Sequence, residues 1–404
     1  MERLIAELAK RRKVLAAREW LECHDDATIA LQRQLAVIPA PTGAEERRGA
    51  FVAARFGDLG LAEVRTDGAG NVLGRLGPAD GAGVVIASHL DTVFPAGTKL
   101  EVREAGARLI APGIGDNARG LAAMLAIVES CRSSNLEPPR PITFIATVGE
   151  EGAGDLRGAK HLFEDPAFKP DAFIALDGAG INRIAHRALG SRRLRAMFKG
   201  PGGHSWAAFG VANAAHAVGA ATTNIAGIAL PASPRTTASV VRIGGGSSLN
   251  TIPQEAWLEL DLRSEAEASL EALYGAVSQA LGKALEAVNR KRSAGTAPLT
   301  LHLEPLGNRP SGVTNEKHAL VRAAVAATRA VGQKPELAAA STDANVPISR
   351  GIPGIALGAG GRGGEAHLES EWYENVNGPA GIFRALLTVL AVVEHGAARA
   401  PGAA

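Results

Sequence analysis

The sequence contains little cysteine, few aromatic residues and no marked excess of charge of either sign. Only two cysteines, Cys23 and Cys131, occur in 404 residues, and neither stands in a CxxC or other metal-ligand spacing. This scarcity argues against a disulfide scaffold and against a cysteine-bound zinc site, so we expect two buried free thiols in a reducing compartment. Because aromatic residues make up only 4% of the chain, its helices should pack through small alanine and glycine side chains.

The weak net charge gives no sign of a nucleic-acid or membrane partner. Lysine and arginine exceed aspartate and glutamate by a net charge of only +2. The N-terminus mixes acidic and basic residues and lacks the apolar core of a signal peptide. The longest apolar run near the C-terminus, residues 385–393, is too short to span a bilayer. We therefore expect a cytoplasmic protein that binds neither nucleic acid nor membrane.

The length and the pattern of the chain predict two domains. Residues 1–189 and 299–404 alternate helical stretches with short, continuously apolar strands, which predicts an α/β domain with a mixed, mostly parallel sheet sandwiched by helices. Residues 190–298 follow the order strand, helix, strand, strand, helix. This order predicts an inserted α+β domain with an antiparallel sheet and two helices.

Potential ligands follow three of the apolar strands. Residues 84–87 lead into His89 and Asp91, residues 142–147 into Glu150 and Glu151, and residues 171–176 into Asp177. Each feature has a plainer explanation, and for the glutamate pair that explanation is a solvated turn. However, ligands of open α/β sheets bind at the carboxyl ends of the strands, so the repeated pattern favours one shared site.

Two further candidates follow glycine-rich segments. Asp116 lies in such a turn, just before a predicted helix at residues 118–131, where it could also serve as an N-cap. A phosphate in this turn would be repelled by Asp116 unless a cation intervened. His367 follows a predicted strand at residues 354–358, although in isolation it would be read as a surface histidine.

Together these residues predict a centre for two divalent ions. Two imidazoles with several carboxylates suit Zn²⁺ first, with Mn²⁺ or Co²⁺ as alternatives. One carboxylate can bridge two ions about 3.5–4 Å apart, as in other dinuclear hydrolases. One glutamate would then remain free for proton transfer.

The chain resembles the dinuclear zinc aminoacylase/carboxypeptidase/dipeptidase metallopeptidase family, and its peptidase T-like branch most closely. The resemblance rests on these segments, in chain order: SHLDTV (88–93), GIGDNARG (113–120), VGEEG (148–152), ALDG (175–178), GPGGHS (200–205), SLNTIP (248–253), DLRS (261–264) and GGEAHLESEW (363–372). They span nearly the whole chain, and their combination is far more specific than any one of them.

The resemblance implies a set of five metal ligands. Asp116 would bridge the two ions. His89 and Asp177 would complete the coordination of one ion, and Glu151 and His367 that of the other. The resemblance also implies a cis peptide bond after Asp116.

Further residues receive catalytic or binding roles from the same resemblance. Asp91 would orient His89, and Glu150 would be the general base that takes a proton from the metal-bridging water. His204 would stabilise the oxyanion from the inserted domain, which would serve as a lid and join two chains into a homodimer. Asn250 and Arg263 resemble positions that hold the substrate.

The function implied by the resemblance is hydrolysis of a small amide, in the first place a di- or tripeptide cut by an exopeptidase. An N-acyl-amino-acid amidohydrolase or another small-molecule aminohydrolase is the alternative, because the same motifs serve all of these reactions. A non-catalytic binding homologue is disfavoured, since every ligand and Glu150 are present. A dinucleotide-binding enzyme is disfavoured too, because neither glycine-rich segment has the GxGxxG spacing.

Overall fold

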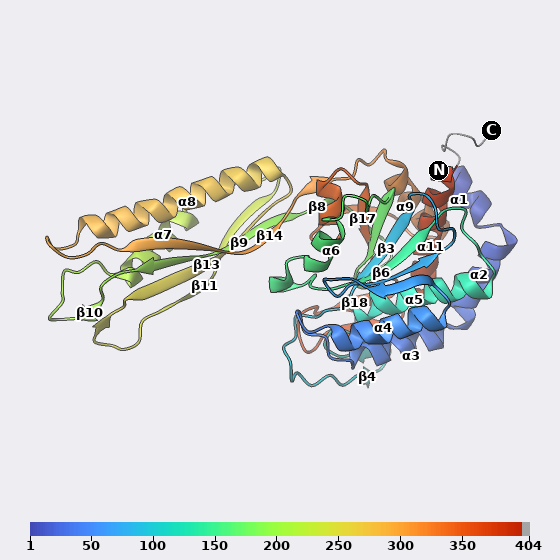
Figure 1. Ribbon diagram of the computed structural model, residues 1–404, viewed down its shortest axis with the longest axis horizontal. Coiled ribbons are helices and arrows are strands. Elements are labelled where there is room, and N and C mark those ends of the chain that lie inside the picture. Colours follow the sequence, from blue (N-terminus) through green and yellow to red (C-terminus); the bar gives the residue numbers. More distant parts are fainter. Residues whose placement is uncertain (398–404) are drawn as a thin grey trace. The chain divides into compact units, whose positions relative to one another are not determined.

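The computed structural model describes residues 1–397, and the chain divides into two compact units (Figure 1). The first unit comprises Met1–Ala188 and Val313–Ala404, and the second comprises Leu189–Gly312. The expected C-terminal boundary of the inserted domain, residue 298, is therefore too early. Thr300–Arg309 forms a strand that pairs with the sheet of the second unit, and the chain returns to the first unit only after it.

The first unit is built on a mixed, nine-stranded sheet, which confirms the predicted fold class. The strands run in the order β1-β2-β6-β3-β7-β17-β8-β15, and β16 also pairs with β8. Pairing is parallel among β6, β3, β7 and β17 at the centre, and antiparallel for β1 with β2 and β2 with β6. The bounds are β1 (Ala62–Thr66), β2 (Val72–Leu76), β3 (Val84–His89), β6 (Ile142–Thr147), β7 (Ala172–Leu176), β8 (Arg183–Ala188), β15 (Gly312–Val313), β16 (Glu336–Ala340) and β17 (Gly354–Leu357).

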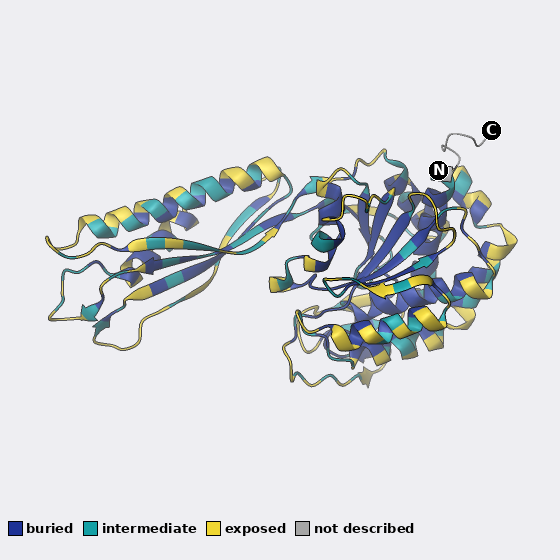
Figure 2. Ribbon diagram, viewed as in Figure 1, coloured by how far each residue is buried: buried dark blue, intermediate teal, exposed yellow. Residues whose placement is uncertain are grey.

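Helices cover both faces of this sheet. Successive side chains of a strand point to opposite faces, so each buried strand packs against the helices on both sides. Val84 and Ile86 pack into the larger core with α5 and α11, whereas Val85 and Ala87 pack against α6 and α10. Figure 2 shows the central strands as buried along their length. The helices of this unit are α1 (Glu2–Leu8), α2 (Arg12–Cys23), α3 (Asp25–Ala36), α4 (Glu46–Asp58), α5 (Ala118–Ser133), α6 (Arg157–Leu162), α9 (Ala319–Ala330), α10 (Asn345–Ser349) and α11 (Gly378–Ala397).

One detail of this unit differs from the sequence-based expectation. Cys131 is buried on α5, as expected, but Cys23 ends α2 on its solvent side and is exposed.

The closing helix α11 is a core helix. Its stretch Gly378–Gly396 is long and apolar enough to cross a membrane, but 78% of that window is buried inside the unit. Its small and aliphatic side chains pack in the same cluster as those of α5 and α9. A buried helix of a globular domain has this apolar character all round, so burial accounts for its composition.

A small antiparallel sheet, which the sequence did not indicate, also belongs to the first unit. Its strands run in the order β18-β19-β5-β4. The bounds are β4 (Arg103–Ala105), β5 (Arg108–Ile110), β18 (Arg362–Gly364) and β19 (Trp372–Glu374). The turn with Asp116 follows β5, and the loop with His367 joins β18 to β19, so this sheet brings two distant segments together.

The second unit is an antiparallel sheet with two helices, as predicted, but it has one strand more than expected. The strands run in the order β11-β13-β9-β14, and α7 and α8 pack on the sheet in a core of their own. A separate pair, β10 and β12, lies in the same unit. The bounds are β9 (Gly190–Lys199), β10 (Gly203–His204), α7 (Ala214–Ala226), β11 (Thr236–Gly245), β12 (Thr251–Ile252), β13 (Glu255–Ser264), α8 (Glu267–Arg290) and β14 (Thr300–Arg309).

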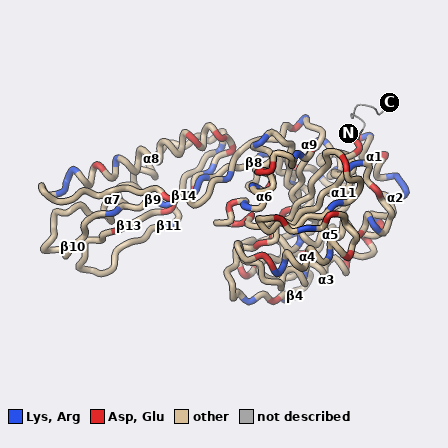
Figure 3. The backbone as a smooth tube through the Cα atoms, in the orientation of Figure 1, with Lys and Arg blue, Asp and Glu red and all other residues tan. Residues whose placement is uncertain are grey.

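Lysine and arginine are interspersed with aspartate and glutamate along the backbone of both units, as Figure 3 shows. Many of them form ion pairs on helices or between neighbouring strands, for example Arg18 with Glu22 and Arg195 with Glu259. This pattern accords with the small net charge.

Candidate metal centre

The register of the central strands places the predicted ligands at one edge of the sheet. In the parallel pairs, His89 is level with Thr147 of β6, and Ala87 is level with Ala175 of β7. Asp177 therefore lies beside His89, and the glutamate pair begins three residues beyond Thr147. Parallel strands end at the same edge, so three segments far apart in the sequence deliver their side chains to one place.

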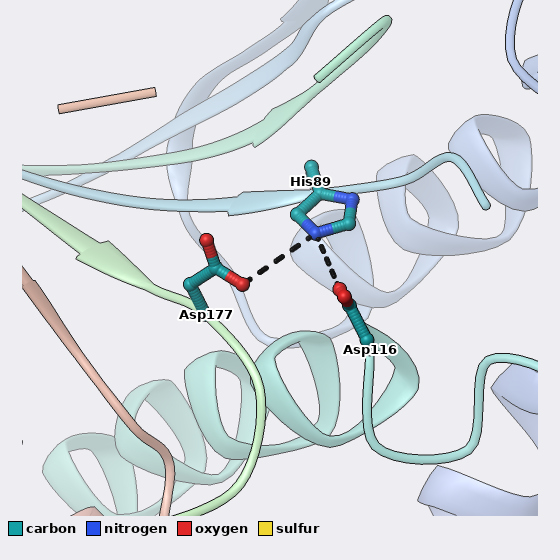
Figure 4. A group of neighbouring side chains, drawn as sticks. All are labelled: His89, Asp116 and Asp177. Atoms are coloured by element: carbon teal, nitrogen blue, oxygen red, sulfur yellow. Dashed lines mark hydrogen bonds and ion pairs between the residues drawn. The ribbon is translucent and has the colours of Figure 1, made fainter. Parts of the chain in front are cut away.

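The first ligand group joins β3, β7 and the turn before α5. The Nε2 atom of His89 lies 2.9 Å from Asp116 Oδ1 and 3.8 Å from Asp177 Oδ1 (Figure 4). The Nδ1–H of His89 donates to the backbone carbonyl of Asp91 at 3.1 Å. Because that carbonyl can only accept, the neutral form of the imidazole has its lone pair on Nε2, toward the carboxylates, where a metal ion would bind.

The second ligand group uses the other oxygen of Asp116. The Nε2 atom of His367 lies 3.3 Å from Asp116 Oδ2 and 3.0 Å from Glu151 Oε1. Within each group the potential ligand atoms lie within 4.8 Å of one another. The potential ligand atoms of His89, Glu150 and Glu151 form a third group within the same distance of one another.

Asp116 thus faces two different imidazoles with its two oxygens, which is the geometry of a bridging carboxylate. The plainer explanation, an N-cap, is wrong: the capping side chain of α5 is Asn117, whose Oδ1 accepts from the N–H of Gly120. Asn117 also donates to the carbonyl of Leu176, which ties the start of α5 to the end of β7. The Asp116–Asn117 peptide bond is cis, as the resemblance implies.

Asp91 organises the loop that carries both glutamates. Its Oδ1 accepts the backbone N–H of Glu150 and its Oδ2 that of Glu151, each at 3.0 Å. Thr42 donates a further hydrogen bond to Oδ2. The carboxylate lies 3.6 Å from Nδ1 of His89, so the role predicted for Asp91 is shared between its carboxylate and its backbone carbonyl. The fully buried Asp91 therefore holds the imidazole and the glutamate loop in one arrangement.

The electrostatics of the cluster favour a bound cation. Hydrogen bonds to Asp116 and Glu151 raise the pKa of His367 to about 10. Burial alone would lower the pKa of His89, but its hydrogen bonds to the surrounding aspartates raise it well above the ordinary value. Burial would likewise raise the pKa of Asp116, yet the two imidazoles lower it well below the ordinary value. This cluster of carboxylates and imidazoles therefore favours bound positive charge, either as protons on the imidazoles or as metal ions between the ligands.

The donor set fits a pair of divalent ions. Imidazole nitrogens and carboxylate oxygens are ligands of Zn²⁺, and carboxylates also suit Mn²⁺ and Co²⁺. Each imidazole has its own carboxylate partners, Asp177 for His89 and Glu151 for His367, and Asp116 is common to both.

In the second unit, β10 pairs with β12, and His204 lies opposite Thr251, the residue after Asn250. The N–H of Ser205 donates to the carbonyl of Asn250 at 2.8 Å. The exposed His204 accepts the backbone N–H groups of Trp206 and Ala207 on its Nδ1, at 3.2 and 3.4 Å. In its neutral form the ring therefore carries the proton on Nε2, and this N–H can donate a hydrogen bond to another molecule.

Arg263 is not brought together with His204 and Asn250. It stands near the end of β13, where it is level with Ser191 of β9, and its guanidinium pairs with Asp261 at 2.8 Å. The β10–β12 pair adjoins the other end of β13, at Glu255. A ten-residue strand is on the order of 30 Å long, so within one chain these residues cannot hold the same small substrate.

Two buried acids near the cluster were not singled out from the sequence. Asp343 accepts a hydrogen bond from Thr147, and burial raises its pKa to about 6. Asp343 follows the strand β16, as the other candidate ligands follow their strands. It was missed because the alanine-rich stretch ELAAA was not recognised as a strand. Glu371 accepts backbone hydrogen bonds from the turn that carries Asp116.

Comparisons with known proteins identify relatives of this chain by sequence and by structure. The sequence profile of peptidase family M20/M25/M40 matches residues 85–393. YqjE of Bacillus subtilis, described as an uncharacterized protein, is 28% identical over 327 residues, which are 76% of this chain and 82% of YqjE.

Solved structures share the fold over nearly the whole chain. The aminopeptidase PepT of Bacillus cereus superposes with a TM-score of 0.72 at 23% identity, over 91% of this chain and 98% of that one. A tripeptidase of Staphylococcus aureus gives a TM-score of 0.74 at 22% identity, with the same coverage. Because the family profile spans the whole second unit and every residue of the ligand cluster, the chain belongs to peptidase family M20/M25/M40 and is a metal-dependent hydrolase of peptide bonds.

Proposed function

We propose that the protein is an exopeptidase that cleaves di- or tripeptides with the help of two divalent ions, Zn²⁺ in the first place. The observation that carries the proposal is the position of Asp116, whose two oxygens lie 2.9 and 3.3 Å from the imidazoles of His89 and His367. A carboxylate shared in this way is suited to bridging two ions. Bound there, the ions would polarise the scissile carbonyl and lower the pKa of the attacking water.

Under this proposal the five ligands divide into a shared one and two pairs. Asp116 would contribute one oxygen to each ion. His89 and Asp177 would hold the ion on the β7 side, and Glu151 and His367 would hold the other.

Glu150 is the proposed general base. It is 5% exposed, so it lies in a site largely closed to bulk water. The Asp91 carboxylate fixes its backbone, and unlike Glu151 it belongs to no ligand group that contains Asp116. A carboxylate left over beside the ions can take a proton from the attacking water and deliver it to the leaving amine.

His204 is the proposed donor to the oxyanion that forms at the carbonyl. Its Nδ1 is occupied by two backbone N–H groups, so its Nε2–H is available in the neutral form. A donor aimed at developing negative charge lowers the barrier by a few kcal/mol. Asn250, whose carbonyl accepts the N–H of Ser205, is a proposed contact of the substrate. Arg263 is proposed for the same role from the family resemblance, although its guanidinium is paired with Asp261.

The second unit is also proposed to join two chains in a homodimer. The strand β11 is an edge of its sheet, and Val241 and Ile243 on that strand expose apolar side chains. Edge strands with apolar side chains are ready-made pairing surfaces. Analytical ultracentrifugation tests the dimer, and a monomer at micromolar concentration would contradict it. The cytoplasmic location stays a prediction.

The substrate class is proposed from the relatives. Two proteins of the same fold are named an aminopeptidase and a tripeptidase, which favours short peptides with a free terminus. The test is a panel of dipeptides, tripeptides and N-acetyl amino acids, assayed with added Zn²⁺, Mn²⁺ or Co²⁺ and with Glu150→Gln as the inactive control. Turnover of N-acetyl amino acids without turnover of any peptide would replace the proposal with an amidohydrolase.

A further inference from the structure

The carboxylate of Glu371 gathers three backbone N–H groups of a single turn. Its Oε1 accepts from Gly115 and from Asp116, both at 2.7 Å, and its Oε2 accepts from Gly113 at 3.1 Å. The residue is 2% exposed. A carboxylate that accepts several N–H groups away from water forms strong, charge-assisted hydrogen bonds and fixes the backbone that donates them.

The backbone of Glu371 is fixed in the same place by the small sheet. Strand β19 begins at the next residue, and Trp372 pairs with Ile110 of β5. The N–H of Ala111 donates to the carbonyl of Glu371 at 3.0 Å, which extends this ladder by one step. Glu371 thus holds the turn with both its backbone and its side chain.

The same residue ends the loop that carries His367. This loop runs from the end of β18 to β19 and has local backbone bonds, from Leu368 to Glu365 and from Glu371 to Leu368. The His367 side chain is 53% exposed, so packing around the ring restrains it little. Its position therefore depends on how firmly its loop is fixed at the Glu371 end.

We propose that Glu371 is a positioning residue that fixes the loop of His367 to the turn of Asp116 and thereby sets the affinity for the second ion. The inference rests on the proposed function only in taking His367 and Asp116 as ligands. The ion held by Asp116, Glu151 and His367 depends on both segments that Glu371 joins. The other ion keeps His89 and Asp177, which stand at the ends of the buried strands β3 and β7.

The first test is metal binding by Glu371→Gln, measured by isothermal titration calorimetry with Zn²⁺. The amide can accept from Gly115 and Asp116, but its NH₂ group then faces the N–H of Gly113. We expect one of the two binding steps to lose affinity by roughly 10–100-fold, the usual effect of residues that orient metal ligands, and the other step to change much less. The matched control is Glu369→Gln, in the same loop and exposed, for which we expect wild-type binding.

Gly115→Ala tests the same contact from the other side without altering Glu371. A Cβ at this glycine would lie 3.0 Å from Glu371 Oε1, and its backbone does not have the left-handed conformation that demands glycine. We expect this variant to weaken the same binding step. Because the steric conflict requires the carboxylate, Gly115→Ala should add nothing further in the background of Glu371→Ala.

The readouts separate positioning from a merely structural role. A structural role would lower the melting temperature of the metal-free protein and leave both binding steps as in the wild type, and that result overturns the proposal. An equal loss at both steps overturns it as well. Because calorimetry counts ions without any substrate, a wild type that binds two ions but cleaves no peptide refutes the proposed function and leaves this test intact.

Discussion

Metal binding by this protein should release protons from the two imidazoles of the cluster. Hydrogen bonds to Asp116 and Glu151 raise the pKa of His367 to about 10, and the aspartates around His89 raise its pKa well above the ordinary value. The ring of His367 is therefore protonated in the metal-free protein at neutral pH, and the aspartates around His89 favour the protonated form of that ring as well. An ion can bind only to the neutral ring, so each ion displaces one proton.

The size of the pH effect on metal affinity follows from the pKa of the imidazole ligand. While the pH stays below the pKa of the ring, each displaced proton raises the logarithm of the apparent affinity by one for each pH unit. The ion held by His367 should therefore bind about 100-fold more tightly at pH 8 than at pH 6, and binding of the ion held by His89 should also tighten as the pH rises. An imidazole with an ordinary pKa of about 6.5 would give a slope that flattens above pH 7.

The assay is a competition titration of Zn²⁺ against a chelator of known affinity, at half-unit steps between pH 6 and pH 8. Calorimetry in two buffers with different enthalpies of ionisation counts the released protons independently. An affinity that does not change between pH 7 and pH 8 would refute the reasoning, because the imidazoles would then be either neutral or not ligands.

Other predictions concern catalysis, the lid and the thiols. Glu150→Gln should lower kcat by at least about 100-fold while both ions still bind, because only proton transfer is removed; metal loss in this variant would assign Glu150 to coordination instead. His204→Ala should lower kcat far more than it changes KM, and equal effects on both would argue against oxyanion stabilisation. If His204 serves the partner's centre in a dimer, mixing the two inactive variants should restore about a quarter of wild-type activity, since half of the dimers are hybrids with one complete centre; no recovery would contradict this arrangement. Alkylation of the folded protein should label the exposed Cys23 and spare Cys131, because burial raises the pKa of that thiol to about 12, and mass spectrometry of the digested protein would show equal labelling if this were wrong.

The central strands and their ligands could be predicted because one physical rule applies to both. Short, β-branched, continuously apolar runs such as Ile142–Thr147 are buried parallel strands, and parallel strands end at one edge. The polar residues that follow them must then meet, whatever their separation in the sequence. This is why His89, Glu151 and Asp177 were predicted together and lie together.

The small sheet could not be predicted, because its strands are only three residues long. Arg103–Ala105 and Arg362–Gly364 are too short to show any periodicity of apolar residues. This sheet brings His367 close to Asp116. The proximity of these two ligands could therefore be predicted only from the family resemblance, not from a pattern of apolar residues. Glu371 was quoted within a motif and received no role, because its partners are backbone N–H groups that leave no trace in the sequence.

The last strand of the second unit was missed for a different reason. In Thr300–Arg309, Pro305 and Gly307 flank an irregularity in the pairing with β9, and they interrupt the alternation of apolar and polar residues. An edge strand tolerates such a break, whereas a central strand does not. The position of Arg263 could not be predicted from the sequence either. A motif assigns a residue type but does not fix its position along a strand relative to other motifs.

The most direct test of the dinuclear centre is anomalous diffraction at the zinc absorption edge from crystals of the metal-loaded protein. We predict two peaks about 3.5–4 Å apart, one on either side of the Asp116 carboxylate, with His89 and His367 bound to different ions. A single peak at full metal loading, or two peaks that do not share Asp116, would contradict the account.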